Sequence, residues 1–379
     1  MREWREAYTL SKRKTDEVVL ERTYRLLTPL FGGGVEPKKA DPVSVVRATE
    51  VRGQLRFWWR AVRGWRSGGR LEELWKLEAQ IFGSAGEGGA SPLWVAVETL
   101  EEGREVEIKE IKEKGRVVQW YLGFPLRDGK VWSPVREGVC FRLRLRFPEA
   151  LKEEVEAALW AWQTFGGLGA RTRRGFGALA LEGAPSPDEK EVREGLKRYS
   201  QEGGWPPDVP HLTPGSLVRV VNLPWRALAE RYQAFRQDRN PGQGNQPGRS
   251  RWPEPDEVRR LQNRHAQKHP PCHPVRKFPR GQFGLPIIFH FKDGGDPEDA
   301  TLQGQEADRL ASPLLFRPLD EGRCLVAVLE APRVPPGGVV LRWGNGGKSV
   351  QVELTPQEAA EIPVLKRKTD PLRAFVESL

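Results

Sequence analysis

One stretch of the chain combines the residue types that bind phosphate groups in proteins. Residues 166–177 hold five glycines and three arginines, Arg171, Arg173 and Arg174. Glycine lets backbone amides approach a ligand closely because it has no Cβ, and a guanidinium group forms paired hydrogen bonds with phosphate oxygens. This composition predicts a loop that contacts a polyanion, the alternative being a helix end followed by a solvated turn.

The elements around this loop exclude a dinucleotide-binding loop of the G-x-G-x-x-G kind. Such loops follow a strand and open a helix, whose N-terminus holds the phosphate. Here a predicted helix at 151–165 precedes the loop and a short apolar strand follows it at 176–179. Thr172 also stands where the third glycine is needed. The glycines therefore serve a different kind of contact.

A second basic element is predicted between residues 53 and 66. Apolar residues recur there at helical spacing, and arginines recur with the same period on another face. The tryptophans fall on the apolar stripe, so we assign them to the core. We expect the arginine face to bind phosphate, the alternative being an ordinary solvated face. The arginines of this face are Arg52, Arg56, Arg60 and Arg63, and Lys38 and Lys39 are secondary candidates.

These stretches resemble a known family. GGLGARTRRGFG at 166–177 is similar to the C-terminal glycine-rich loop of RAMP proteins, the RNA-binding superfamily of CRISPR effector complexes. With TPLFGGG at 28–34 and RGQLRFWWR at 52–60, the chain resembles the tandem-RAMP first subunit of the type III-B (Cmr) effector. The resemblance covers mainly residues 18–180 and is weaker beyond them.

The order of predicted elements indicates an α+β chain. The first half reads strand, helix, two strands, helix, strand, which is the βαββαβ order of a ferredoxin-like, RRM-like domain. Residues 141–147, FRLRLRF, alternate apolar side chains with Arg142, Arg144 and Arg146, which predicts a strand with arginines on an open sheet face. A Phe-Gly pair followed by Ser-Pro-Leu occurs in both halves, so we expect two tandem ferredoxin-like RAMP domains.

Composition places the domain boundaries. We expect a first domain at 1–185, a linker at 186–215 and a second, divergent domain at 216–379. The linker is rich in proline, glycine and charge. A long, mobile, basic insertion is expected at 237–282. No arginine-rich glycine loop precedes the predicted closing helix at 370–379, so RNA contact is expected from the first domain.

Charge and cysteine content narrow the class of protein. The net charge of +10 and the excess of arginine over lysine favour a polyanionic partner such as nucleic acid. The three cysteines are too widely spaced for a disulfide framework, which indicates a reducing compartment. The charged N-terminal residues do not have the pattern of a signal peptide, and no apolar run approaches the ~18 residues of a membrane span. We therefore expect a cytoplasmic protein.

Residues suited to catalysis or metal binding are scarce. His265, His269, Cys272 and His273 cluster, but their spacing matches no established zinc motif and prolines interrupt it, so we expect no metal site. Cleavage of RNA needs a general base, commonly histidine, near the 2′-hydroxyl. The first half has no histidine, and His211 is the first one in the second half.

The family resemblance implies a function in antiviral defence. It implies a non-catalytic subunit, without cofactor, of a type III-B CRISPR effector ribonucleoprotein. Its partners would be other Cmr subunits and single-stranded RNA, either guide or target, engaged at one end of the complex. Two alternatives stay open. One is a metal-independent ribonuclease that processes guide RNA with His211 or a histidine of 265–273. The other is a scaffold whose arginines dock onto neighbouring subunits without touching RNA.

Overall fold

A computed structural model gives the fold. It describes residues 16–32, 34, 41, 44–85, 89–106, 112–113, 116–117, 121–124, 127–128, 131–242 and 248–379. Lys38 and Lys39 lie outside these residues. None of the helices in the described ranges is both long and apolar enough to cross a membrane.

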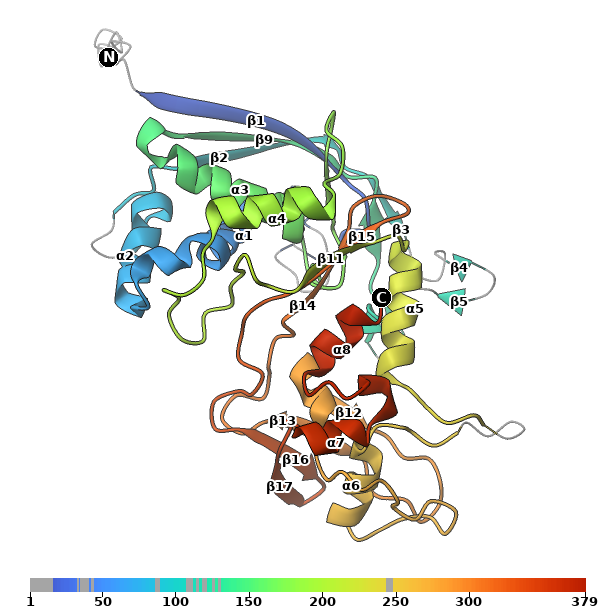
Figure 1. Cartoon of the computed structure of the whole chain (residues 1–379). Helices are drawn as coiled ribbons and strands as arrows, with labels where there is room; N and C mark the ends of the chain where they lie inside the picture. The colour runs from blue at the N-terminus through green and yellow to red at the C-terminus, as the bar shows by residue number, and fades with distance from the viewer. Residues whose placement is uncertain are drawn as a thin grey trace, which may run out of the picture.

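The first half is built on a four-stranded antiparallel sheet (Figure 1). Its strands lie in the spatial order β10-β1-β9-β2, which is 4-1-3-2 when these four strands are numbered along the chain. This is the order that a β-α-β-β-α-β chain adopts when both helices cover one sheet face. The strands are β1 (Glu17–Leu26), β2 (Trp94–Glu101), β9 (Cys140–Pro148) and β10 (Leu179–Leu181).

Helices α1 (Ala48–Arg63) and α3 (Lys152–Phe165) pack on that sheet and on each other. The predicted assignment of the tryptophans to the core is confirmed, because Trp58 and Trp59 are buried. A 3-10 turn, η1 (Gly64–Ser67), leads into α2 (Leu71–Phe82), and another, η4 (Glu149–Leu151), precedes α3. Helix α1 is therefore held between the sheet, α2 and α3.

The alternation predicted for 141–147 is confirmed in β9. The apolar side chains of this strand are buried in the core, whereas its arginines point to the open face. Each arginine there meets a carboxylate from a neighbouring strand. Arg142 lies 2.8 Å from Glu98, and Arg144 lies 2.8 Å from Glu21. The open face is thus charge-paired rather than uniformly basic.

Short strands form an insertion between β2 and β9. The pairs are β3 (Arg104–Val106) with β8 (Val135–Glu137), β4 (Lys112–Glu113) with β5 (Arg116–Val117), and β6 (Arg127–Asp128) with β7 (Val131–Trp132).

The second half repeats part of the same order. A three-stranded antiparallel sheet, β11-β15-β14, forms from β11 (Val218–Val221), β14 (Leu314–Pro318) and β15 (Cys324–Val328). Helix α5 (Trp225–Arg236) follows β11, and α8 (Pro371–Glu377) closes the chain. Within the described residues no fourth strand completes this sheet.

The second sheet is buried on both faces. Leu315 and Leu325 belong to the apolar core that contains α1 and α3, whereas Phe316 and Val326 belong to the core that contains α5 and α8. Side chains alternate between the two faces of a strand, so β14 and β15 each contribute to both cores. The two halves therefore share buried surface.

The range 186–215, expected to be a linker, contains a packed helix. Helix α4 (Glu189–Tyr199) begins with a capping box in which Asp188 and Glu191 bond each other's backbone amides. Its residues Val192 and Leu196 are fully buried in the first core. The charged residues that suggested a linker form the outer face of this amphipathic helix.

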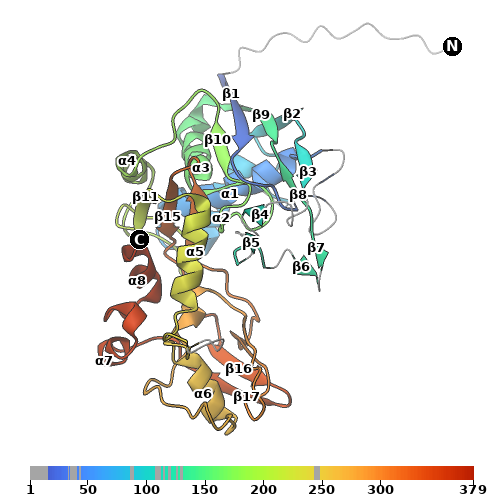
Figure 2. The same ribbon diagram turned by 90° about the vertical axis from the view of Figure 1, so that its right-hand side faces the viewer.

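A third layer lies at the end of the molecule opposite β1 (Figure 2). Its sheet has the order β12-β13-β16-β17, and α6 packs with it. Of the range 237–282, expected to be mobile, residues 248–282 are held in place by apolar contacts. Val258 and Phe278 are buried in this layer, and Trp252 is buried in the core that contains α5 and α8. The layer contains α6 (Glu254–Leu261), η5 (Pro279–Phe283), β12 (Ile287–Phe289), β13 (Ala300–Gly304), β16 (Val339–Trp343) and β17 (Gly346–Val350). Before α8 the chain forms α7 (Pro356–Ala360) and η6 (Pro363–Leu365).

Candidate nucleic-acid interface

The glycine-rich loop lies at the joint between the two halves. The backbone amide of Phe316 in β14 donates to the carbonyl of Arg173 at 3.1 Å. The indole Nε1 of Trp225 in α5 donates to the carbonyl of Arg174 at 2.8 Å. The loop backbone is therefore hydrogen-bonded to a strand and a helix of the second half.

Two glycines of the loop are required by close packing. Gly177 has φ near +60°, and a Cβ there would lie 2.0 Å from the carbonyl oxygen of Leu168. Gly175 has φ near +86°, and its Cβ would lie 2.6 Å from Nε1 of Trp225. Positive φ is accessible to glycine at little cost. Because of these turns, the strand predicted at 176–179 begins only at Leu179, the first residue of β10.

The loop arginines bond to carbonyl oxygens across the joint. Arg173 donates to the carbonyl of Ser312 at 2.7 Å, and Arg174 donates to that of Leu314 at 2.7 Å. The Arg174 guanidinium also lies over the ring of Tyr232, at 5.4 Å. The second half also donates to the first, because the buried Arg317 of β14 donates to the carbonyl of Gln163 in α3 at 2.8 Å.

Arg171 is held by the insertion of the first half. Its Nε and one terminal nitrogen donate to the carbonyl of Leu122 at 3.1 and 2.7 Å. Burial, with a contribution from Arg174, lowers the pKa of Arg171 to about 10, and the same causes lower the pKa of Arg173 to about 10. All three loop arginines thus have partners within the chain, and their contact with RNA stays a prediction.

The arginine face of α1 is more accessible. Arg56 and Arg60 both bind the carboxylate of Glu78 in α2, and the distance from Arg60 is 3.0 Å. Their side chains are 40% and 35% exposed, whereas Glu78 is buried. Arg52, one turn earlier, donates to the carbonyls of Phe82 and Leu93 at 3.0 and 3.3 Å. Two guanidinium groups therefore share one carboxylate, and the third bonds to neutral carbonyl oxygens.

Arg63 does not belong to this accessible face. Only 4% of it is exposed, and it forms an ion pair with Glu154 of α3. The same carboxylate accepts a hydrogen bond from Nε1 of Trp59 at 2.7 Å and binds Arg66. Burial alone would raise the pKa of Glu154, but these partners lower it below its usual range. Arg63 therefore ties α1 to α3.

Helix α1 and the loop are directly connected. Glu50, in the first turn of α1, accepts a hydrogen bond from the backbone amide of Gly169. Burial raises the pKa of Glu50. Glu50, Glu78 and Glu154 were not identified from sequence, because their partners lie on other elements and no local spacing links them.

The four residues of the 265–273 cluster do not converge. Cys272 and His273 donate their backbone amides to Asp256, each at 2.9 Å. Within the described part of the chain, the metal-ligating atoms that lie within 4.8 Å of one another belong instead to His269, Asp293 and Asp296. The side chain of Asp296 already receives two hydrogen bonds from Arg259, both at 3.1 Å. A guanidinium at this distance opposes the binding of a cation.

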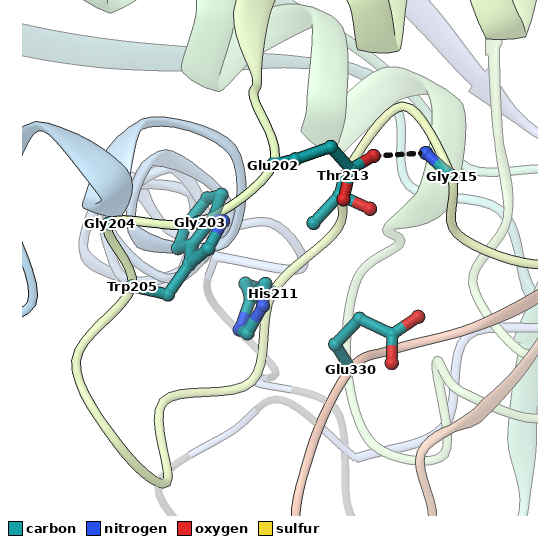
Figure 3. Close-up of a pocket in the computed structure, with 8 residues that line it drawn as sticks. All are labelled: Glu202, Gly203, Gly204, Trp205, His211, Thr213, Gly215 and Glu330. Atoms are coloured by element: carbon teal, nitrogen blue, oxygen red, sulfur yellow. Dashed lines mark hydrogen bonds between the residues drawn. The ribbon is translucent and has the colours of Figure 1, made fainter.

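His211 lines a polar pocket of about 430 Å³ (Figure 3). Its ring stacks on Trp205 with the centroids 4.2 Å apart, and its Nδ1 lies 2.7 Å from the carbonyl of Val209. Burial lowers the pKa of His211. Glu202 and Glu330 also line the pocket, and no lysine or arginine does.

Part of the chain is similar to a known protein family. The sequence model of the RAMP superfamily matches residues 23–180. The similarity to the RAMP superfamily therefore lies in the first half of the chain. The matched stretch contains the whole first sheet apart from the ends of β1 and β10, both helices that cover the sheet, and the glycine-rich loop.

Two curated relatives come from Pyrococcus furiosus (strain ATCC 43587 / DSM 3638 / JCM 8422 / Vc1). CRISPR system Cmr subunit Cmr1-1 is 31% identical over 153 residues, which span 40% of this chain and 44% of that protein. Cmr subunit Cmr1-2 is 25% identical over 174 residues, which span 41% of this chain and 91% of that protein. The chain therefore matches less than half the length of Cmr1-1.

The fold is also similar along nearly the whole chain to a solved structure. The crystal structure of Cmr1 from Pyrococcus furiosus in its apo form superposes with a TM-score of 0.52 at 19% identity, covering 95% of this chain and 96% of that one. At this identity the similarity shows the fold alone. The fold of this chain is accordingly similar to that of Cmr1.

Proposed function

We propose that this chain is a non-catalytic RNA-binding subunit of a type III-B CRISPR effector ribonucleoprotein. Its sequence similarity to the Cmr1 subunits of Pyrococcus furiosus supports membership of such a complex. The observation that carries RNA binding is the charge excess on α1, where Arg56 and Arg60 share the single carboxylate of Glu78 and Arg52 bonds to neutral carbonyl oxygens. Half-exposed guanidinium groups in excess of their counter-ions attract phosphates.

We further infer that the chain is a tandem of two ferredoxin-like domains. The 4-1-3-2 order of the first sheet supports the first copy. The β-α-β-β-α order of β11, α5, β14, β15 and α8 supports a second copy that lacks the closing strand. The domains at 1–185 and 216–379 would then meet through the glycine-rich loop. Lys38 and Lys39 remain expected RNA contacts, as do the loop arginines.

The pocket around His211 argues against the ribonuclease alternative. A general base for cleavage needs the phosphodiester close to it. The pocket presents two carboxylates, Glu202 and Glu330, and no cationic side chain that would hold a phosphate. Its charge therefore repels the substrate that cleavage would require.

The test is RNA affinity measured over a salt series. Removing Arg56 and Arg60 alone would leave the buried Glu78 without a counter-ion, so the variant is Arg56→Gln, Arg60→Gln, Glu78→Gln. The slope of log affinity against log salt is about −0.7 per phosphate contact for single strands, so two lost contacts flatten it by about 1.4. The variant should bind two unrelated labelled RNAs more weakly by similar factors, because phosphate contacts do not read sequence.

Glu78→Gln alone is the matched control. It removes the competing carboxylate and keeps both arginines, so it should tighten RNA binding. Arg142→Gln tests the charge-paired open face and should leave the slope unchanged. If the triple variant keeps the wild-type slope, α1 is not the RNA site. Cleavage of RNA by the purified chain, lost in His211→Ala, would instead favour the ribonuclease.

A further inference from the structure

Arginine is distributed unevenly between paired and unpaired environments. On the open face of the first sheet and on α1, arginines bind carboxylates. At the joint, among the residues the structure describes, no carboxylate forms an ion pair with Arg171, Arg174 or Arg236. A buried guanidinium without a counter-ion is costly unless hydrogen bonds or an anion compensate it. We call Arg171, Arg174, Arg236, Tyr121 and Tyr232 the joint cluster.

The members of the joint cluster differ in how well they are bonded. Arg171 and Arg174 have carbonyl partners at 2.7 Å. Arg236, in the last turn of α5, has one long hydrogen bond, 3.4 Å, from its terminal nitrogen to the hydroxyl oxygen of Tyr232. Its Nε is buried and has no partner. Arg236 is therefore the least well bonded guanidinium of the cluster, although, against the effect of burial, Tyr232 and the more distant carboxylate of Glu254 favour its charged form and raise its pKa.

The tyrosine hydroxyls add further donors. The oxygen of Tyr232 receives Arg236 and, at 3.5 Å, Arg174. An oxygen that accepts from two guanidinium groups keeps its own O–H free to donate, and no acceptor for it is found among the described residues. Tyr121 packs edge-on against Tyr232, with ring centroids 5.7 Å apart. Donors thus converge here and acceptors are missing, which is the chemistry of an anion site.

The charge around Tyr232 is correspondingly positive. Tyr232 is fully buried, and burial alone would raise its pKa. Arg236 and Arg174 outweigh burial and hold the pKa of Tyr232 below its usual value of 10. The nearby Arg280 contributes no excess, because the buried Glu254 lies 3.2 Å from its Nε. Arg171, Arg236 and Tyr121 are only half-buried, so solvent reaches the cluster.

We propose that Arg171, Arg236 and Tyr121, the members of the joint cluster that solvent reaches, bind a phosphate group of single-stranded RNA at the joint between the two halves, while the buried Tyr232 holds Arg236 in position. This assignment rests on the proposed RNA-binding function and adds a site on the second half of the chain. Guanidinium and phenol donors match the several acceptor oxygens of a phosphodiester. Helix α5 runs from the joint toward the third layer (Figure 2). An RNA strand bound at the joint would therefore cross between the two halves.

The test compares full-length variants in binding labelled oligouridylate. Arg236→Gln should weaken binding about tenfold, since a hydrogen bond to a charged group contributes about 1.5 kcal/mol or more. It should also flatten the salt slope by about 0.7. Tyr232→Phe keeps the packed ring and loses only the hydroxyl that holds Arg236, so it should weaken binding several-fold. Because it also removes two buried hydrogen bonds, its binding is measured well below its Tm. Arg231→Gln, an equal charge change at an exposed position of α5, is the control and should bind like wild type.

A second measurement separates this site from the proposed function. Inorganic phosphate should raise the Tm of the wild type relative to chloride at equal ionic strength, and should not do so for Arg236→Gln. If wild type binds RNA but Arg236→Gln and Tyr232→Phe bind it equally well, the joint site is wrong and the proposed function stands. If phosphate stabilises through Arg236 but no RNA binds, the anion site stands and the function fails. Equal stabilisation by acetate would overturn the assignment to phosphate.

Discussion

At the scale of single residues, the acceptor that each guanidinium meets decides what an arginine does in this chain. Arg63 meets a buried carboxylate and ties two helices together. Arg173 meets a carbonyl and ties the loop to the second half. Arg56 shares a carboxylate with a second arginine and stays 40% exposed. Only the last environment leaves positive charge available at the surface, because there the cations outnumber the anions.

The glycines in and after the loop differ in whether the surrounding atoms, or only the backbone conformation, require glycine. Gly177→Ala should destabilise the protein by more than about 3 kcal/mol, because the new Cβ overlaps the carbonyl of Leu168 in addition to the penalty for positive φ. Gly183→Ala is the control. Its φ is also positive, near +78°, but nothing lies within 4 Å of the new Cβ, so about 1–2 kcal/mol is expected. Urea unfolding measures both, and equal losses would contradict the steric account.

His211 should make stability depend on pH on the acid side. Burial lowers the pKa of its imidazole below its usual value of 6.5, so the unfolded chain binds the proton more readily than the folded one. Its contribution is therefore present above pH 6.5 and is lost as the pH falls through the lower, folded-state pKa.

A pH series of Tm values tests this behaviour. The variant His211→Gln loses the stack on Trp205 and should have a lower Tm than wild type at pH 8. That difference should narrow toward pH 5. His290→Gln, a substitution of an exposed histidine, serves as control. A Tm difference between wild type and His211→Gln that does not change with pH would contradict the predicted effect of burying His211.

At the scale of elements, α1 is positioned by polar contacts as well as by its apolar face. Glu154 of α3 binds Arg63, Arg66 and Trp59, and Glu78 of α2 binds Arg56 and Arg60. Two buried carboxylates thus fix the rotation of α1 about its axis. This rotation determines which arginines reach the surface.

For the ion pair between α1 and α3, removing one partner should destabilise the protein more than removing both. Glu154→Ala should cost about 3 kcal/mol, because it leaves the buried guanidinium of Arg63 with only the exposed carboxylate of Glu153, 3.1 Å away, as counter-ion. The double variant Arg63→Met, Glu154→Met removes both charges and should cost much less. Chemical denaturation of the two variants decides the matter. Equal losses would mean that packing, and not charge, holds the helices together.

At the scale of the whole molecule, the two halves are joined by a shared core as well as by the loop. Leu315, Leu325 and Leu329 of the second half pack in the same apolar cluster as α1 and α3. The domain boundary read from the sequence is therefore a boundary in topology, whereas the buried surface runs across it.

This shared core makes a fragment of residues 1–185 a sharp test. The sequence alone predicts a soluble unit that ends before the linker. The structure predicts instead that the fragment exposes the faces of α3 and β10 that the second half covers, and also lacks α4. We expect it to aggregate or to lose its near-ultraviolet circular dichroism, while the full chain unfolds in one transition. A soluble fragment with a cooperative melt would show that the first core is sufficient.

The sequence by itself determined the elements whose cause is local. The alternation of 141–147, the apolar stripe of the first helix and the order of strands and helices followed from period and spacing, and the RAMP resemblance of the first half was already present in its glycine and arginine pattern. Only the tertiary structure decided which arginines are available. Glu78, Glu154 and the carbonyls of β14 approach from distant parts of the chain, and a charge pattern along one helix carries no information about them. The same reason explains why α4 and residues 248–282, polar in composition, are ordered: the apolar surfaces that hold them come from elsewhere in the fold.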